Sequence, residues 1–592
     1  MNLVVRLRES PWLQLVLLLG LTAAVLVTKF GNGLIYDDHA MIEVSDRIHQ
    51  LSNIPAFFSH NTMWGASGEG LADHLTQLDT WRPVTMTTFA LDAQLSGREP
   101  WAYHLTNLVW HLMAVALVFA LGRSVLRVEE RPWALVGAAF FAFHPALTEA
   151  HVWINGRSDV LAGVFGLAAL VLSLRATAAS SRGRAVGLSV AVGGALLLGC
   201  LSKEVVLMMT PLLPLSAWMF ADAGATWRTR LRSALAASIA PAVAGGLYLI
   251  TRTTVLSGMK AFGDASDRLN ALSRLPLVLL SGLSTAVVPR NLYFRHLFEE
   301  FSGLDAWVFV AAAAGLIGIA VAAFVLRRRA PALVWGLAGF ALVLLPASVI
   351  AVTSGWWGFN RYLYVPVALL APGLAQLVAM TVAWLRAEGR EPAVRWVSYG
   401  LIAYLGLEVG LTLLCIGEYH DEVRFYQAIV DQAPESSHGH AGLGVALVQQ
   451  QRFEEAASEL RIAMAIQPDY VPTRANLIVA LTEVGAIDEA RAVAERSVEL
   501  WPQDLSFRQL LARTWMPDNP SVGVEILLTC LVIEPEREDA RGDLWFAITE
   551  HPRHVELQAV VAGLLREPRF VSIAPQVGTL LEKARSLPAA AP

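Results

Sequence analysis

Long apolar stretches separated by short polar ones dominate the first 416 residues of the chain. A helix of about 20 mostly apolar residues is long enough to cross a bilayer. The pattern predicts eleven membrane-spanning helices, near residues 11–28, 105–121, 132–146, 159–175, 186–201, 204–220, 233–251, 306–326, 332–351, 362–385 and 397–416. Arg6 and Arg8 precede the first helix. More apolar runs follow it and no clear cleavage site appears, so we interpret it as an uncleaved span rather than a signal peptide.

Arginine is concentrated in alternate loops between these spans. Five loops carry three arginines each, namely Arg123, Arg127 and Arg131; Arg175, Arg182 and Arg184; Arg228, Arg230 and Arg232; Arg327, Arg328 and Arg329; and Arg386, Arg390 and Arg395. Short loops rich in Lys and Arg stay in the cytoplasm, which predicts an inside N-terminus. All five arginine-rich loops fall on the cytoplasmic side only if a further apolar stretch, 274–289, does not fully cross the membrane. We expect that stretch to be re-entrant or to lie along the outer face, which leaves the C-terminal part outside the cytoplasm.

The pattern changes near residue 417, where charged, helical sequence replaces the apolar runs. Prolines recur at 434, 468, 502 and 535, at intervals of 34, 34 and 33 residues. LGVALVQQQRFEEAASELRIAMAIQP (443–468) aligns with LIVALTEVGAIDEARAVAERSVELWP (477–502), which pairs Ala446 with Ala480, Gln451 with Gly485 and Ala456 with Ala490. This period and these small residues are typical of tetratricopeptide repeats, which offer a concave surface to protein partners.

The sequence therefore predicts an α protein in two parts. A polytopic helical membrane domain covers 1–416 and has a long first outer loop, 29–104. A tetratricopeptide-repeat solenoid on the outer side covers 417–592 and serves as a protein-binding or spacing module.

Composition supports this division. Of the 592 residues, 55% are hydrophobic and 16% are charged, well below the quarter that is usual in soluble proteins. The net charge of −5 comes without a basic patch, which argues against a nucleic-acid partner. The three cysteines show neither a disulfide framework nor zinc-ligand spacing.

Polar residues in the membrane part gather in loops of the predicted outer face. Ionisable groups at membrane depth are costly and are functional candidates by default. The adjacent acids Asp37 and Asp38 follow the first span. Four further segments on the same face hold the other candidates: WRPVTMTTFALDAQLSGREPWAYHLTNLVWH (81–111), FHPALTEAHVWINGRSDVLAG (143–163), CLSKEVVLMMTP (200–211) and SGWWGFNRYLYVPVALL (354–370).

These residue types suit chemistry on a lipid-linked phosphate. A carboxylate can act as general base on an acceptor hydroxyl, and two carboxylates can instead hold a divalent cation. Arg157, Lys203 and Arg361 can bind a phosphate leaving group. An acid beside a phosphate clamp at the bilayer edge fits a sugar linked to a lipid phosphate, whose tail stays in the membrane while the sugar meets an outer acceptor.

Each candidate also has a structural interpretation. The adjacent acids can form a solvated turn, and Lys203 and Glu204 can form a local ion pair at a helix start, with Ser202 as N-cap. Arg361 can anchor at the membrane interface beside aromatic residues, and His144 before a proline can pack in a turn. His104 and His111 share a helical face, but seven residues is too far for the usual metal-binding pair.

In order, the segments DD, WRPVTMTTFALDAQLSG, HLTNLVWH, HPALTEAHVWINGRSD, LSKE and NRYLYVP, followed by tetratricopeptide repeats, resemble the transmembrane and tetratricopeptide-repeat O-mannosyltransferases and their bacterial relatives. The resemblance covers nearly the whole chain and implies a GT-C glycosyltransferase fold. It implies inverting transfer of a sugar, mannose in the eukaryotic members, from a polyprenyl-phosphate donor to a protein hydroxyl or another envelope acceptor. A divalent cation is compatible with it but is not required.

The resemblance also assigns roles to residues. Asp37 and Asp38 become the candidate catalytic residues, one of them as base. The candidate substrate-binding residues are Arg82, His104, His144, Glu149, Arg157, Asp159, Lys203, Glu204, Arg361 and Tyr362. The composition, rich in Ala, Leu and Arg, favours a bacterial inner membrane with the repeats in the periplasm, and the same topology in a eukaryote would place them in the ER lumen. Two other hypotheses stay open, a polytopic glycan polymerase or ligase that uses lipid-linked sugars, and a non-catalytic membrane-anchored repeat scaffold.

Overall fold

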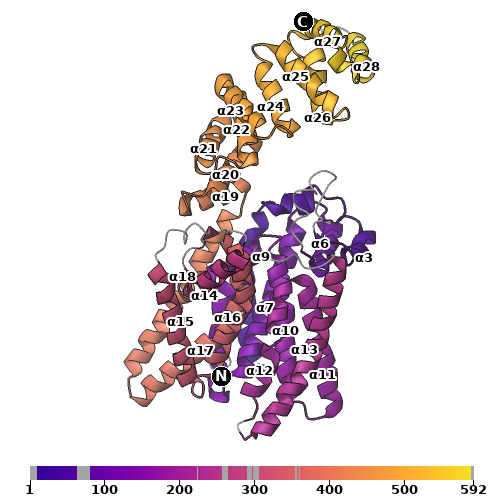
Figure 1. The fold of residues 1–592 in the computed structure, drawn as a ribbon. Coiled ribbons are helices and arrows are strands. Elements are labelled where there is room, and N and C mark those ends of the chain that lie inside the picture. The colour runs from indigo at the N-terminus through magenta and orange to yellow at the C-terminus, as the bar shows by residue number, and fades with distance from the viewer. Residues whose placement is uncertain are drawn as a thin grey trace. The chain divides into compact units, whose positions relative to one another are not determined.

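The computed structural model describes residues 10–62, 64, 80–222, 224–256, 265–289, 292, 296–297, 306–353, 356–358 and 360–587. The chain divides into two compact units, 1–425 and 426–592. Helices dominate both (Figure 1). A two-residue strand, β1 (His296–Leu297), pairs antiparallel with β2 (Trp356–Gly358), so that His296 lies opposite Gly358.

Eight helices of the first unit, among the residues described, are long and apolar enough to cross a membrane. They are α2 (Pro11–Leu26), α7 (Trp101–Val125), α10 (Arg157–Thr177), α11 (Arg182–Ser202), α13 (Trp227–Val255), α15 (Ala306–Leu326), α17 (Tyr364–Ala387) and α18 (Glu391–Glu418). Such helices satisfy their own backbone hydrogen bonds in lipid. They correspond to eight of the eleven expected spans, and they make this a multi-pass membrane protein.

The other three expected spans are shorter or interrupted helices. The region 132–146 holds α8 (Ala134–Phe143), which follows the short helix η4 (Val128–Trp133) and ends before Pro145. A residue that precedes proline disfavours the helical conformation, and His144 is accordingly extended. The region 204–220 is divided at Pro211 into η6 (Glu204–Met209) and α12 (Leu212–Met219). The third lies in α16 (Pro331–Thr353), which contains Pro346.

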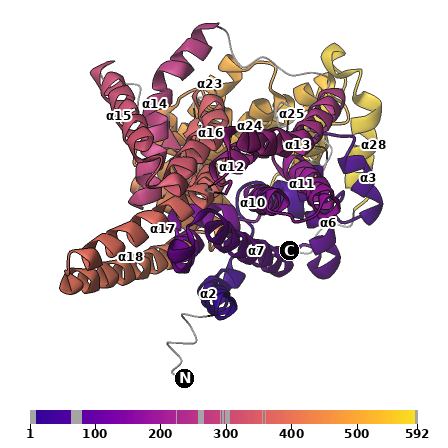
Figure 2. The same ribbon diagram turned by 90° about the horizontal axis from the view of Figure 1, so that it is seen from below.

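The centre of the first unit is built on α10 and α17. Helix α10 packs against α7, α11, α12 and α17, and Figure 2 shows it end-on among its neighbours. Helices α16 and α17 approach closely at glycines, because a Cβ on Gly336 would lie 2.8 Å from the Leu369 carbonyl oxygen, and one on Gly373 would lie 2.6 Å from the Leu333 Cα. Small residues at such contacts let helices pack in a bilayer.

Two of the arginine-rich loops meet at one end of this unit. The Arg127 guanidinium donates to the carbonyl oxygens of Arg328 and Arg329, at 3.0 and 3.2 Å. This contact is consistent with the proposal that these loops lie on one side of the membrane. The ambiguous stretch 274–289 falls largely in α14 (Ala265–Val287), whose Ala286 carbonyl accepts a hydrogen bond from His144 at 3.1 Å.

Short helices connect the long ones. They are η1 (Val27–Gly31), η2 (His39–Glu43), η3 (Leu51–Asn53), α3 (Ile54–Phe57), α6 (Pro83–Ser96), η5 (Pro145–Leu147), α9 (Thr148–Val152) and η8 (Asn360–Leu363). Figure 1 shows α3, α6 and α9 at one end of the helix bundle. These connecting segments supply most of the polar residues considered below.

Helix α19 (Glu422–Gln432) crosses the boundary between the units, and the second unit continues as successive helix pairs. They are α20 (Ser437–Gln449) with α21 (Phe453–Ile466), α22 (Val471–Glu483) with α23 (Ile487–Leu500), α24 (Leu505–Trp515) with α25 (Pro520–Ile533), and α26 (Glu538–Thr549) with α27 (His554–Leu564), before η9 (Pro568–Phe570) and α28 (Ala574–Arg585). Pro468, Pro502 and Pro535 each follow the second helix of a pair. The expected repeat architecture is confirmed.

The aligned residues of the repeats occupy equivalent places. Ala446 and Ala480 are buried at 2% and 0% exposure, in the first helix of successive pairs. Gln451 and Gly485 form the turn inside each pair, with φ of 60° and 80°. Glycine adopts this left-handed conformation freely, whereas a residue with a Cβ is strained in it. The second repeat therefore has the better turn residue.

Candidate active site

The adjacent acids of the first loop differ in their surroundings. The turn before them contains Tyr36, whose φ of 53° is in the left-handed region. Asp38 is 1% exposed. Its carboxylate oxygens accept from the backbone N–H groups of Ile35, at 3.4 Å, and Asn155, at 3.0 Å. Asp37 is exposed, and its Oδ2 lies 3.5 Å from the Asn155 side-chain nitrogen.

These surroundings give the two acids different chemistry. Burial raises the pKa of Asp38 to about 8, although its two backbone hydrogen bonds oppose this. Asp38 is therefore mostly neutral at pH 7, and it fixes the first loop to the segment that contains Asn155. Asp37 faces solvent and interacts electrostatically with the Arg361 guanidinium. Of the two adjacent acids, only Asp37 is exposed, so it is the one that can come within hydrogen-bond reach of an acceptor hydroxyl.

Four charged side chains from separate segments form a cluster. It contains Glu149 of α9, Asp159 in the first turn of α10, Lys203 between α11 and η6, and Arg361 of η8. The Lys203 Nζ lies 2.6 Å from Asp159 Oδ1. The Arg361 guanidinium lies 2.8 Å from Glu149 Oε1 and 3.7 Å from Asp159 Oδ2. The backbone N–H of Arg361 donates to the other Glu149 oxygen at 3.1 Å.

Aromatic rings border this charged cluster. The Arg361 guanidinium lies 4.7 Å from the Trp153 ring centroid and 5.4 Å from that of Tyr362. The Lys203 Nζ lies 4.7 Å from the Tyr362 ring centroid. Rings at these distances attract cations, which holds Arg361 and Lys203 in place. The Arg361 side chain keeps 15% of its surface exposed, so it can contact a bound ligand.

A third cation lies beside the cluster. Arg82, just before α6, approaches Glu204 at 3.4 Å, and both side chains are partly exposed. Arg82 also interacts electrostatically with Asp159 and Arg361, and Lys203 interacts with both arginines. Three cations therefore converge on one region. Each of them already pairs with a carboxylate, Arg82 with Glu204, Lys203 with Asp159 and Arg361 with Glu149, so a bound anion would share these cations with the acids of the cluster.

The acids of the cluster can adapt to an added anion. Burial raises the pKa of Glu149 to about 7, against the opposing effect of Arg361. Glu149 can therefore take up a proton near neutral pH, which leaves Asp159 and Asp37 as the acids that still act on Arg361. Burial lowers the pKa of Lys203 to about 8, and the neighbouring Asp159 opposes that change. Lys203 stays mostly charged at pH 7.

Arg157 has its partners inside the protein. It is fully buried and lies 2.5 Å from Asp92. It also donates to the Asn107 side chain at 2.5 Å and to the Tyr103 carbonyl at 2.9 Å. These bonds join the start of α10 to α6 and α7. We expected Arg157 to bind substrate, but these contacts give it a positioning role.

Two histidines expected at the site are also internal. His104 is 1% exposed and its Nε2 lies 3.1 Å from the Asn32 carbonyl oxygen. His144 is equally buried, and the carbonyl of Ala286 accepts its hydrogen bond. Within the described residues, no group of three or more His, Cys, Asp or Glu side chains could hold a metal ion.

The sequence did not single out several residues that organise the site. Asp92 pairs with Arg157 inside the protein, and Asn155 joins both acids of the first loop. Lys29, at the end of the first span, is fully buried and donates to the His151 carbonyl at 2.7 Å. A lone lysine at membrane depth is itself a marker for such a role.

Comparisons with known proteins agree with this architecture. A family model described as tetratricopeptide repeat matches residues 447–514. A protein O-mannosyl-transferase of Caenorhabditis elegans, F38B6.6, is 24% identical over 466 residues, which is 77% of this chain and 63% of that protein. Mouse TMTC3, also named a protein O-mannosyl-transferase, is 30% identical over 28% of this chain and 17% of its own length. Drosophila melanogaster Tmtc2, also named a protein O-mannosyl-transferase, is 29% identical over 42% of this chain and 26% of its own length.

The expected resemblance to the O-mannosyltransferases is therefore confirmed over most of the chain, and the bacterial origin stays a prediction. The chain spans less than two thirds of the length of these relatives. Among solved structures, the crystal structure of the APC/C hetero-tetramer Cut9-Hcn1 aligns with 14% identity over 80% of this chain and 90% of that chain, at a TM-score of 0.20, too low to support a shared fold.

Proposed function

We propose that this chain is a membrane glycosyltransferase. It transfers a sugar, with mannose as the first candidate, from a polyprenyl-phosphate donor to a hydroxyl group of a protein or another envelope acceptor. The reaction takes place on the outer side of the membrane, where the repeats also lie. The resemblance to proteins named O-mannosyl-transferases supports the class of reaction. The observation that carries the proposal is an exposed carboxylate, Asp37, that interacts electrostatically with the partly exposed cation Arg361.

In the proposed reaction Asp37 removes the proton from the acceptor hydroxyl. The acceptor oxygen forms a bond to the anomeric carbon, the bond from that carbon to the phosphate oxygen breaks, and the configuration inverts. The lipid phosphate leaves with the bonding electron pair. Arg361, Lys203 and Arg82 stabilise its developing charge, because cations fixed where charge develops lower the barrier. Asp38 and Asn155 position Asp37 by holding its turn.

The first test measures transfer with purified protein in detergent. It uses radiolabelled polyprenyl-phosphate mannose and an extract of envelope proteins. Loss of general base catalysis lowers rates about 10²–10⁴-fold, so Asp37→Asn should nearly abolish transfer. Asp38→Asn should keep most of it at pH 7. The matched control is Asp46→Asn, which removes an exposed carboxylate of the same loop, paired with Arg98 at 2.6 Å.

Two results would reject this assignment. Full activity of Asp37→Asn would remove Asp37 from catalysis. A folded but inactive Asp38→Asn beside an active Asp37→Asn would reverse the roles of the two acids. Transfer only to glycan, and not to protein, would favour a glycan polymerase or ligase. Absence of transfer with a full panel of lipid-linked sugars would favour the scaffold hypothesis.

A second test concerns the phosphate clamp. Arg361→Lys keeps the charge but loses the planar fork that can contact Glu149 and a phosphate together. We expect a higher KM for the lipid donor and a lower kcat, with the KM for the acceptor unchanged. An unchanged donor KM would show that Arg361 does not contact the donor.

A further inference from the structure

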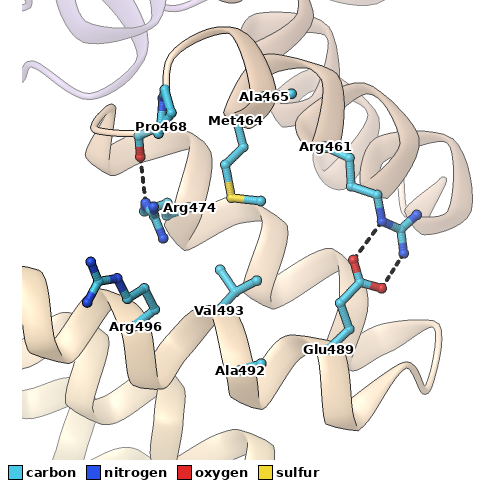
Figure 3. Close-up of a pocket in the computed structure, with 9 residues that line it drawn as sticks. All are labelled: Arg461, Met464, Ala465, Pro468, Arg474, Glu489, Ala492, Val493 and Arg496. Carbon is cyan, nitrogen blue, oxygen red and sulfur yellow. Dashed lines mark hydrogen bonds and ion pairs between the residues drawn. The ribbon is translucent and has the colours of Figure 1, made fainter.

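A pocket of about 400 Å³ lies in the repeat unit between α21, α22 and α23 (Figure 3). Met464 of α21 and Val493 of α23 give it an apolar lining. Figure 3 shows Arg474 and Arg496 together on one side and the pair of Arg461 with Glu489 on the other. A pocket of this size is in the range that holds a drug-sized molecule, so it can accept a few side chains but not a folded domain.

The arginines on the two sides differ in how their charge is satisfied. Arg461 donates two hydrogen bonds to the Glu489 carboxylate, at 2.7 and 2.6 Å, so this pair is neutral. Arg496 pairs with Glu499 at 2.8 Å, but both side chains are more than half exposed. Such exposed pairs are weak and exchange readily. Arg474 is only 8% exposed and forms no ion pair with any residue that the structure describes.

The preceding repeat shows what Arg474 lacks. At the equivalent position, one 34-residue period earlier, His440 contacts the Pro434 carbonyl at 2.9 Å. Arg474 makes the same contact with the Pro468 carbonyl, at 2.7 Å. His440 also contacts a carboxylate, since its Nδ1 lies 2.6 Å from Glu459 Oε2.

The residue equivalent to Glu459 in the next repeat is Val493, which lines the pocket. One repeat therefore supplies its own carboxylate at the place where the other has an apolar side chain. The backbone contact of Arg474 uses its Nε, and the other guanidinium nitrogens remain for a second partner. Burial lowers the pKa of Arg474. The negative charge of Asp469 opposes this decrease, whereas the positive charge of Arg496 increases it. An added anion would relieve that repulsion.

We infer that this pocket binds an acidic, extended peptide segment of a protein partner. One carboxylate of the segment contacts Arg474 and Arg496, in the place that Glu459 occupies in the preceding repeat. An adjacent aliphatic side chain of the segment packs on Met464 and Val493. This inference is independent of the transfer reaction, because binding requires no sugar donor.

The test measures binding of fluorescent octapeptide pools to the full-length protein in detergent by anisotropy. The pools have a fixed central Leu-Glu or Leu-Gln and blocked ends, and their other positions are degenerate among non-acidic residues. We expect the Glu pool to bind at least about tenfold more tightly, the ratio that a charge-assisted hydrogen bond supports. A third pool with no acidic side chain but a free C-terminal carboxylate distinguishes a chain end from a side chain as the source.

Two variants test the same contact from opposite directions. Arg474→Gln removes the cation and keeps a donor for the Pro468 carbonyl. Val493→Glu supplies the carboxylate that the preceding repeat already has, and so should block the pocket. Both should lower binding of the Glu pool about tenfold without loss of helicity by circular dichroism. Val493→Leu is the matched control and should bind like the wild type.

Equal binding of the Glu and Gln pools would overturn the inference. So would unchanged binding by a folded Val493→Glu variant, or no binding of any acidic pool at about 1 mM, the weak end of specific recognition. A failure of sugar transfer would leave this result unaffected.

Discussion

Asparagine in place of Asp38 tests whether the two acids of the first loop have separate roles. Asp38 is 1% exposed and accepts hydrogen bonds from two backbone N–H groups. Asparagine has nearly the same shape and no charge at any pH. If Asp38 is neutral in the folded protein at pH 7, this variant reproduces its charge and keeps an acceptor for the Asn155 N–H, whereas its amide NH2 cannot accept from Ile35. It should therefore fold and function, with a modest loss of stability.

The magnitude follows from the shift in pKa. Burial moves the pKa of Asp38 from 3.8 to about 8 in the folded protein. Between those values the folded state holds a proton that the unfolded state has lost. The contribution of Asp38 to stability is therefore fully present below pH 3.8 and is lost as pH rises through about 8. The loss is at most about 1.4 kcal/mol per pH unit.

The assay is thermal unfolding in detergent between pH 5 and pH 9, with wild type and Asp38→Asn measured side by side. The stability of the wild type should decline relative to the variant as pH rises and level off above about pH 8, because the variant lacks this titration. Asp46→Asn, which removes an exposed acid, should run parallel to the wild type. Parallel curves for wild type and Asp38→Asn would show that Asp38 is ionised in the fold across this pH range.

Further predictions concern the turn of the repeats, the buried ion pair and the helix contact. Gln451→Gly should stabilise the repeat unit by up to about 1 kcal/mol, and Gly485→Gln should destabilise it by a similar amount, as measured by thermal unfolding, because both positions have left-handed φ. Arg157→Met should cost about 3–5 kcal/mol by leaving Asp92 buried without its partner, and adding Asp92→Asn should recover part of that loss in the same assay. Gly373→Val should lower the yield of folded protein by size-exclusion chromatography, because its Cβ would meet the α16 backbone at 2.6 Å; a normal yield would show that the two helices can move apart.

Much of the fold could be predicted from local pattern. A long apolar helix is favoured in a bilayer because it satisfies its own backbone groups, so eight spans were found from hydropathy. A fixed period with small residues identified the repeats, since each helix pair must stack on the next. The pattern was less informative where prolines divide the apolar sequence, as at Pro145 and Pro211, because an apolar run does not show where its helix ends.

The candidate site could be predicted only in part. Topology indicated that loops from distant parts of the chain meet, and the structure brings Glu149, Asp159, Lys203 and Arg361 together. The sequence could not show that Arg157 lies inside the protein against Asp92, although it is of the same residue type as Arg361. Hydropathy and loop position are the same for an arginine that faces a ligand and for one that holds two helices together.

By itself, the sequence determined which segments enter the membrane and which form repeats. Both depend on the transfer free energy and the periodicity of neighbouring residues, which are local quantities. The tertiary structure alone decided which of two adjacent aspartates is buried, because a backbone N–H 117 residues away, that of Asn155, bonds to Asp38. It also decided that Arg474 lies beside Val493 rather than a carboxylate. The charge state of a side chain depends on the groups that folding brings within a few ångströms of it, and those come from anywhere in the chain.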